Sequence, residues 1–134
     1  MTTSALNILS LGNVPQLLFK LSGANLQSTS DQPFSPMLYS GSAYVVTTII
    51  ARQRTGGASV TCAGGIYDTA AKGGNAIVAA AQSWVTLASG VIVSATLATV
   101  ATTVLLVNTP ILSLTTASTA ACTADFYIFG VDIS

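Results

Sequence analysis

The sequence predicts an all-β protein, an antiparallel β-sandwich of the jelly-roll type with about eight strands. Short runs of β-branched and aromatic residues recur along the chain and are separated by Gly, Ser, Asn and Pro, a pattern typical of strands joined by turns. Several runs alternate apolar and polar residues, as half-buried strands do. Hydrophobic residues make up 51% of the chain and charged residues only 6%, which argues against disorder.

The first 40 residues contain fewer strand-like runs than the rest of the chain. We expect residues 1–40 to form an extended N-terminal arm with one strand near LLFKL at 17–21, because Pro33 and Pro36 interrupt the segment that follows. The start of the chain is not expected to be a signal peptide, since it lacks a basic beginning and its apolar residues are interrupted. Residues 41–134 are then expected to form the β-sandwich.

Strands are clearer in this second part. The segment YVVTTIIARQR at 44–54 is the strongest, and TGG at 55–57 can turn the chain into a returning strand at 59–67, which predicts a hairpin. The segment at 75–84 is ambiguous, because Asn75 can cap a short helix that the alanines favour. Further strands are expected at 84–88, 91–97, 103–107, 111–117 and 124–133.

Two strands are apolar on both faces. In the last strand Tyr127 and Phe129 lie on one face, and Phe126 and Ile128 on the other; strand 44–50 behaves in the same way. An antiparallel strand of this kind needs a cover on each face, which the arm or a neighbouring subunit can supply. We therefore expect a homo-oligomer or a docked structural protein. The residues expected to contact other chains are Leu17, Leu18, Phe19, Tyr67, Phe126 and Ile128.

The ionisable residues offer little for chemistry. The chain has no histidine and no glutamate, and its four cations balance four aspartates. A neutral chain lacks the positive field that nucleic acids require, and without histidine the Ser–His and Cys–His nucleophiles and the commonest metal ligand are absent. We expect no enzyme, with no catalytic residue, metal or cofactor. So few charges also favour an assembly over a monomer with a Thr/Ser-rich surface.

The segment AGGIYDTAAKGGNA at 63–76 raises the question of a phosphate loop. Lys72 precedes its second glycine pair, and no Ser or Thr follows in the Walker register; the G-x-G-x-x-G pattern is also missing. We interpret the segment as a strand end that runs into a Gly-hinged loop. Another chain can approach closely at Gly73 and Gly74, and Asp68 and Lys72 can form a weak surface ion pair.

Three further features admit two interpretations each. Arg52 and Arg54 share one face at a strand end, where they either bind a partner's carboxylates or simply solvate the strand. Cys62 and Cys122 are expected to be buried free thiols unless the fold brings them together to pair. The uncharged window 85–107 is long enough to span a bilayer, but its Thr, Ser and Val residues favour strands and turns.

Four segments in order carry a resemblance: LSGANLQSTSDQPF (21–34), YVVTTIIARQ (44–53), AGGIYDTAAKGGNAIVAAAQSWVTL (63–87) and LSLTTASTAACTADFYIFGVDI (112–133). In the order of these segments and in their residue patterns, the chain resembles small virion proteins of tailed bacteriophages, in particular jelly-roll decoration (cement) proteins. The resemblance implies a homotrimer that binds the major capsid protein on the outside of the capsid, stabilises the lattice and is assembled in the bacterial cytoplasm. It carries over no catalytic residue.

Related jelly rolls serve instead in head fibres or as tail-associated modules that bind receptors or carbohydrates. For that alternative the aromatic side chains that can stack on a sugar are Trp84, Tyr39 and Tyr67.

Overall fold

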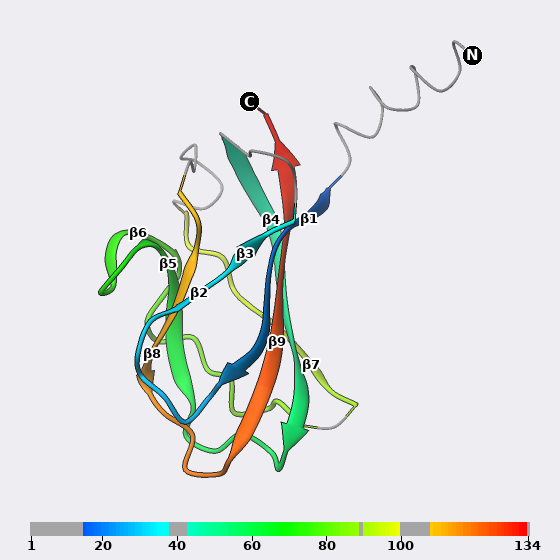
Figure 1. The fold of residues 1–134 in the computed structure, drawn as a ribbon, viewed down its shortest axis with the longest axis vertical. Helices are drawn as coiled ribbons and strands as arrows, with labels where there is room; N and C mark the ends of the chain where they lie inside the picture. The colour runs from blue at the N-terminus through cyan, green and yellow to red at the C-terminus, as the bar shows by residue number, and fades with distance from the viewer. Residues whose placement is uncertain (1–14, 38–42, 89, 100–107, 134) are drawn as a thin grey trace, which may run out of the picture.

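The protein consists of two antiparallel sheets that face each other, as Figure 1 shows for a computed structural model describing residues 15–37, 43–88, 90–99 and 108–133. One sheet has the order β3-β1-β9-β4-β7 and the other the order β2-β8-β5-β6. The strands are β1 Gln16–Asn25, β2 Gln32–Pro33, β3 Ser35–Pro36, β4 Tyr44–Gly56, β5 Ala63–Thr69, β6 Gly73–Val78, β7 Ile92–Ser94, β8 Ile111–Thr116 and β9 Cys122–Asp132. The two sheets agree with the all-β prediction, and their two layers are consistent with a β-sandwich.

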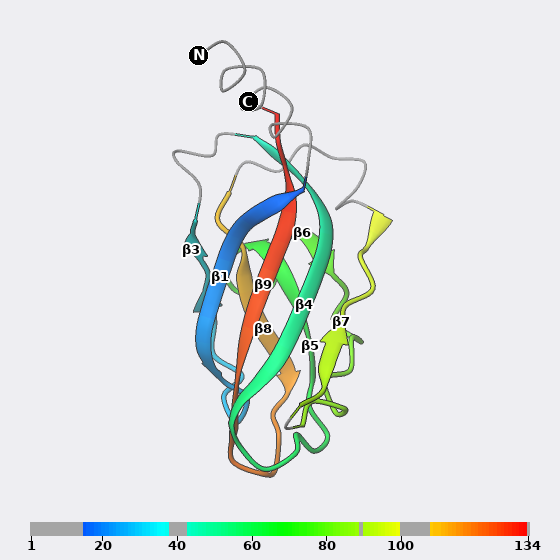
Figure 2. The same cartoon turned by 90° about the vertical axis from the view of Figure 1, so that its right-hand side faces the viewer.

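Strand β9 is the centre of the five-stranded sheet. It pairs with β1 from Gln16↔Gly130 to Asn25↔Thr123, and with β4 from Tyr44↔Asp132 to Gly56↔Cys122. Figure 2 shows β9 between these two neighbours, with β7 beyond β4. The last strand of the chain therefore joins its first long strand to the strand that begins at residue 44.

The core lies between the two sheets. Phe126 and Ile128 of β9 and Leu112 and Leu114 of β8 are fully buried there. The ring of Trp84 meets the Phe126 ring edge-on at 5.0 Å between centroids, and its indole N–H donates to the carbonyl of Gly64 at 3.1 Å. Each such side chain contributes about 1.5–3 kcal/mol by leaving water, so this contact between layers is a main source of stability.

The predicted arm is wrong for residues 16–36, which belong to the sandwich itself. Strand β1 is an inner strand of its sheet, β3 pairs with β1, and β2 pairs with β8 in the other sheet. A bulge between Leu17 and Phe19 lets the consecutive Leu18 and Phe19 both reach the interior. The chain itself buries Leu18 and Phe19 of this segment, while Leu17 and Lys20 are half-buried. Residues 1–14 lie outside the described residues.

The predicted hairpin of 44–54 with 59–67 is also wrong. Strand β4 pairs with β9 and β7, and the chain crosses at 57–62 to the other sheet, where β5 pairs with β8 and β6. The crossing is anchored at Ser59, which is buried and donates its hydroxyl to the Trp84 carbonyl, while Gly57, Ala58, Val60 and Thr61 are exposed. Pairing of Gly56 with Cys122 extends β4 past the expected turn.

The ambiguous segment 75–84 contains the end of β6 and then turns, so the helix option is not realised. Residues 84–88 form a turn instead of a strand, and the predicted strand at 91–97 shortens to β7. The strands expected at 111–117 and 124–133 are confirmed as β8 and β9. The strand expected at 103–107 lies outside the described residues.

The glycine-rich segment forms the β5–β6 hairpin, which confirms a strand running into a glycine-containing loop. The Asp68 carboxylate organises its tip: it accepts from the backbone N–H of Asn75 at 2.7 Å, from the Asn75 side chain at 2.9 Å and from the Thr69 hydroxyl at 3.2 Å. Asp68 is buried and bonds to Asn75, so the surface ion pair expected with Lys72 is not formed. A Cβ on Gly74 would lie 2.2 Å from an Asp68 carboxylate oxygen, so this glycine serves the hairpin's own packing.

Strands β5 and β8 run close together at Gly64, which has no side chain. A Cβ at this position would lie 2.4 Å from the Cα of Leu114, and the backbone of β8 cannot move aside as a flexible side chain can. We expect Gly64→Ala to lower the free energy of unfolding by about 1–3 kcal/mol. Gly57→Ala is the matched control, because a Cβ there meets nothing within 4 Å and should change stability by less than about 0.5 kcal/mol. Equal urea midpoints for the two variants would contradict this account.

Candidate interaction face

The side of the five-stranded sheet that points away from the core is the candidate site; Figure 2 looks onto it. Strand register aligns its side chains in rows. Lys20, Tyr127 and Ile50 stand side by side on β1, β9 and β4. We call this surface the outer face; its members are Leu17, Lys20, Val45, Thr48, Ile50, Arg52, Arg54, Ile92, Ser94, Asp125, Tyr127, Phe129 and Val131.

Much of the outer face is apolar. Tyr127, Phe129 and Val131 are half-buried, whereas Phe126 and Ile128, which alternate with them, are fully buried. The prediction that this strand is apolar on both faces is therefore confirmed, and only one of those faces is sealed in the single chain. On β7, at the edge of the same sheet, Ile92 is 62% exposed. A broad, partly exposed apolar sheet face is suited to binding another surface.

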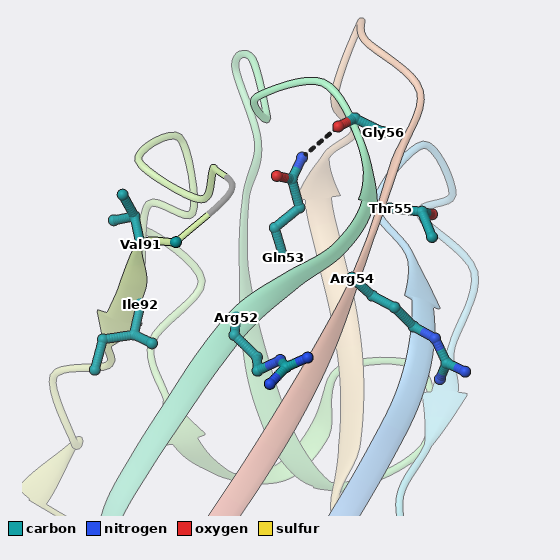
Figure 3. A pocket seen from close by; sticks show the side chains of 8 residues that line it. Arg52, Gln53, Arg54, Thr55, Gly56, Val91 and Ile92 are labelled. Carbon is teal, nitrogen blue, oxygen red and sulfur yellow. Dashed lines mark hydrogen bonds between the residues drawn. The ribbon is translucent and has the colours of Figure 1, made fainter.

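Charged side chains cluster at one end of the outer face. The Asp125 carboxylate is almost buried and accepts from the backbone N–H of Gly23 at 2.8 Å and from the Arg54 guanidinium at 3.4 Å. The Lys20 ammonium lies 5.4 Å from the centre of the Tyr127 ring, within range of a cation–π contact. Arg52 is exposed and forms no ion pair within the described residues. Figure 3 shows Arg52 and Arg54 extending from β4 toward the neighbouring strands.

The structure corrects most of the residues that we predicted to contact other chains. Leu17 does lie on the outer face, but Leu18, Phe19, Phe126 and Ile128 are buried in the core. Tyr67 is also buried, at 6% exposure, with its ring beside Gly65. Neighbouring residues of a strand point to opposite faces, and the chosen residues of β9 belong to the face that packs inward.

The residues that the prediction missed are Lys20, Ile50, Tyr127, Phe129 and Val131. Their signal was present in the sequence, because the alternation separates Tyr127 and Phe129 from Phe126 and Ile128. Alternation divides a strand into two faces without saying which of them meets the other sheet. That choice depends on the register between distant strands.

The aromatic side chains considered for carbohydrate stacking do not form a platform in the described residues. Trp84 is fully buried, and its indole N–H is occupied by the Gly64 carbonyl. Tyr67 is buried as well. Tyr39 lies outside the described residues.

Other site chemistry is sparse in the part of the chain that the structure describes. It contains no group of three or more acidic or cysteine side chains placed to hold a metal ion. Among those same residues, no helix has the length and apolar character needed to cross a membrane. Cys62 and Cys122 are buried and unpaired, as expected, and burial raises the pKa of the Cys62 thiol to about 11.

Comparison with protein-family models, curated proteins and solved structures finds no match for the chain. The outer face and the composition are therefore the observations from which a function can be proposed.

The buried Cys62 thiol should make stability fall at alkaline pH. Its pKa is about 11 in the folded chain against 9.0 ordinarily, so the neutral thiol contributes fully below pH 9.0 and this contribution is lost as the pH rises to about 11. Between about pH 8 and 11 the wild type should lose up to about 2 kcal/mol more unfolding free energy than Cys62→Ala. Burial also raises the pKa of Tyr44, which adds a loss common to both proteins. Parallel pH profiles from urea titrations would refute this assignment.

Proposed function

We propose that this protein is a structural virion component that binds the outside of a bacteriophage capsid as an oligomer, a trimer, and stabilises the lattice. The observation that carries the proposal is the apolar outer face of the five-stranded sheet, which a single chain leaves partly exposed. The capsid as partner, the jelly-roll connectivity and the trimer rest on the resemblance to decoration proteins.

Docking through the outer face explains a composition that is unusual for a free protein. With only 6% charged residues the chain has little to keep copies apart in solution, whereas burial of the outer face on a partner removes apolar surface from water. A capsid repeats one surface many times, so an oligomer that meets several subunits at once gains avidity from individually weak contacts. Rigid β-sheets hold the contacting side chains in place before binding.

The alternative, a receptor- or carbohydrate-binding module of a head fibre or tail, has weaker support. Trp84 and Tyr67 are buried, so these two rings cannot stack on a sugar without rearrangement. The half-buried Tyr127 is flanked by Ile50 and the Lys20 side chain in a flat row, which suits a protein surface better than a sugar pocket.

Phe129→Ser tests the proposal, because the Phe129 side chain is apolar, half-buried and central on the outer face. We expect about a tenfold or greater loss of capsid affinity, the range for an aromatic residue at an interface, and a loss of about 1–2 kcal/mol in unfolding free energy because the ring is half-buried. Val60→Ser is the control, since Val60 is 41% exposed in the 57–62 crossing and off the outer face.

Sedimentation velocity of the purified protein, alone and with capsids, gives both the oligomeric state and the binding. A stable monomer that never associates with capsids would refute the proposed function. Equal binding by Phe129→Ser and Val60→Ser would show that the outer face is not the surface used.

A further inference from the structure

Three of the four cations of the chain, Lys20, Arg52 and Arg54, lie on the outer face, and the carboxylate among them belongs to Asp125. Three cations against one carboxylate leave this cluster with a surplus of two positive charges, although the chain as a whole is neutral. A local positive surface on a neutral protein favours an anionic partner at that place.

The Asp125 carboxylate in this cluster already accepts hydrogen bonds from other residues of the chain. Asp125 accepts from Gly23 and Arg54, and its side chain is only 8% exposed. Arg54 keeps 51% of its side chain exposed and uses one N–H on Asp125, out of five that a guanidinium offers. Arg52 forms no ion pair or hydrogen bond within the described residues, and contact with the Tyr127 ring leaves the charge of Lys20 in place. The cluster can therefore accept further carboxylates.

A hollow with an apolar wall adjoins the arginines. It has a volume of about 510 Å³ and lies between the end of β4 and residues 90–92. Figure 3 shows the β4 residues Arg52 and Arg54 on one side of it, with their side chains extending toward the neighbouring strands, and Val91 and Ile92 on the other side. Val91 and Ile92 are 44% and 62% exposed, so the wall is open to a ligand. A ligand that combines negative charge with an apolar group would satisfy both sides.

We infer that this end of the outer face binds an acidic segment of a different protein, with carboxylates at Lys20, Arg52 and Arg54 and an apolar side chain against Ile92. The identity of that protein as a capsid subunit rests on the proposed function; the chemistry of the segment does not. Such charge pairs orient a docking surface and speed its association more than they add affinity.

A second copy of this chain is a poor source of the carboxylates. Asp68 and Asp125 are buried, and Asp132 already has an interaction within the chain. Asp31 is exposed but accepts from the backbone N–H of Ala71 on the opposite side of the sandwich, so only a head-to-tail contact between copies would bring it to the outer face. Nucleic acid is disfavoured too, because three cations neutralise few phosphates and the same surface presents apolar side chains beside them.

A synthetic peptide of glutamate and leucine is the probe, with the peptide of glutamine and leucine and a single-stranded DNA oligonucleotide as comparisons. Amide chemical shifts of the wild-type protein should move at Lys20, Arg52 and Ile92 with the glutamate peptide, and high salt should abolish the change. The double variant Lys20→Gln/Arg52→Gln should bind about two- to fivefold more weakly per charge removed. Lys72→Gln, at the β5–β6 tip, is the charge-matched control and should bind as the wild type does.

The inference is overturned if the glutamine peptide binds as well, if DNA binds more tightly than the glutamate peptide, or if the double variant keeps its affinity. Capsid binding separates this result from the proposed function. If the wild type binds capsids and the double variant binds them equally at every salt concentration, the proposed function stands and the inference is wrong. If no capsid binding occurs, the peptide measurements still decide the inference.

Discussion

The pairing of β9 with β1 on one side and β4 on the other is the interaction on which the rest of the structure depends. It joins the end of the chain to β1, about a hundred residues earlier, and to β4, which is also distant in sequence, so these three strands of the larger sheet must meet together. Contacts of such large sequence separation have a high entropy of closure, which must be offset by the burial that follows. The inward side chains of β9, which include Phe126, are also the ones that meet the second sheet.

The same pairing positions the candidate site. Side chains alternate along β9, so the register that turns Phe126 and Ile128 inward also turns Tyr127 and Phe129 outward. A slip by one residue would exchange these two sets, which the burial of the core forbids. Bulges between Leu17 and Phe19 in β1 and between Val46 and Thr48 in β4 shift the register of the flanking strands. The register that packs the core therefore also determines which side chains form the outer face.

Local signals in the sequence were sufficient for the class of fold and for the strongest strands, but not for the pairing. Alternation and β-branched runs located β4, β8 and β9 because these properties belong to neighbouring residues. The prediction of a hairpin after residue 54 is wrong because Gly56 pairs with Cys122, a partner far away in the sequence. The prediction of an arm is wrong for a related reason, since LLFKL pairs with the distant strand β9. The site residues were chosen from the wrong faces, because alternation shows two faces and only distant packing decides which one is buried.

The scarce charges follow a consistent division of roles. Two carboxylates are placed inside, where Asp68 fixes the β5–β6 hairpin and Asp125 binds the backbone of β1 and Arg54. Buried carboxylates that accept several hydrogen bonds act as structural acceptors and are not available to a partner. The cations of the outer face remain at the surface, so a chain of zero net charge presents a positive end beside an apolar sheet. In a docking protein this combination separates two tasks: the apolar part supplies affinity, and the cations select the orientation in which that affinity is realised.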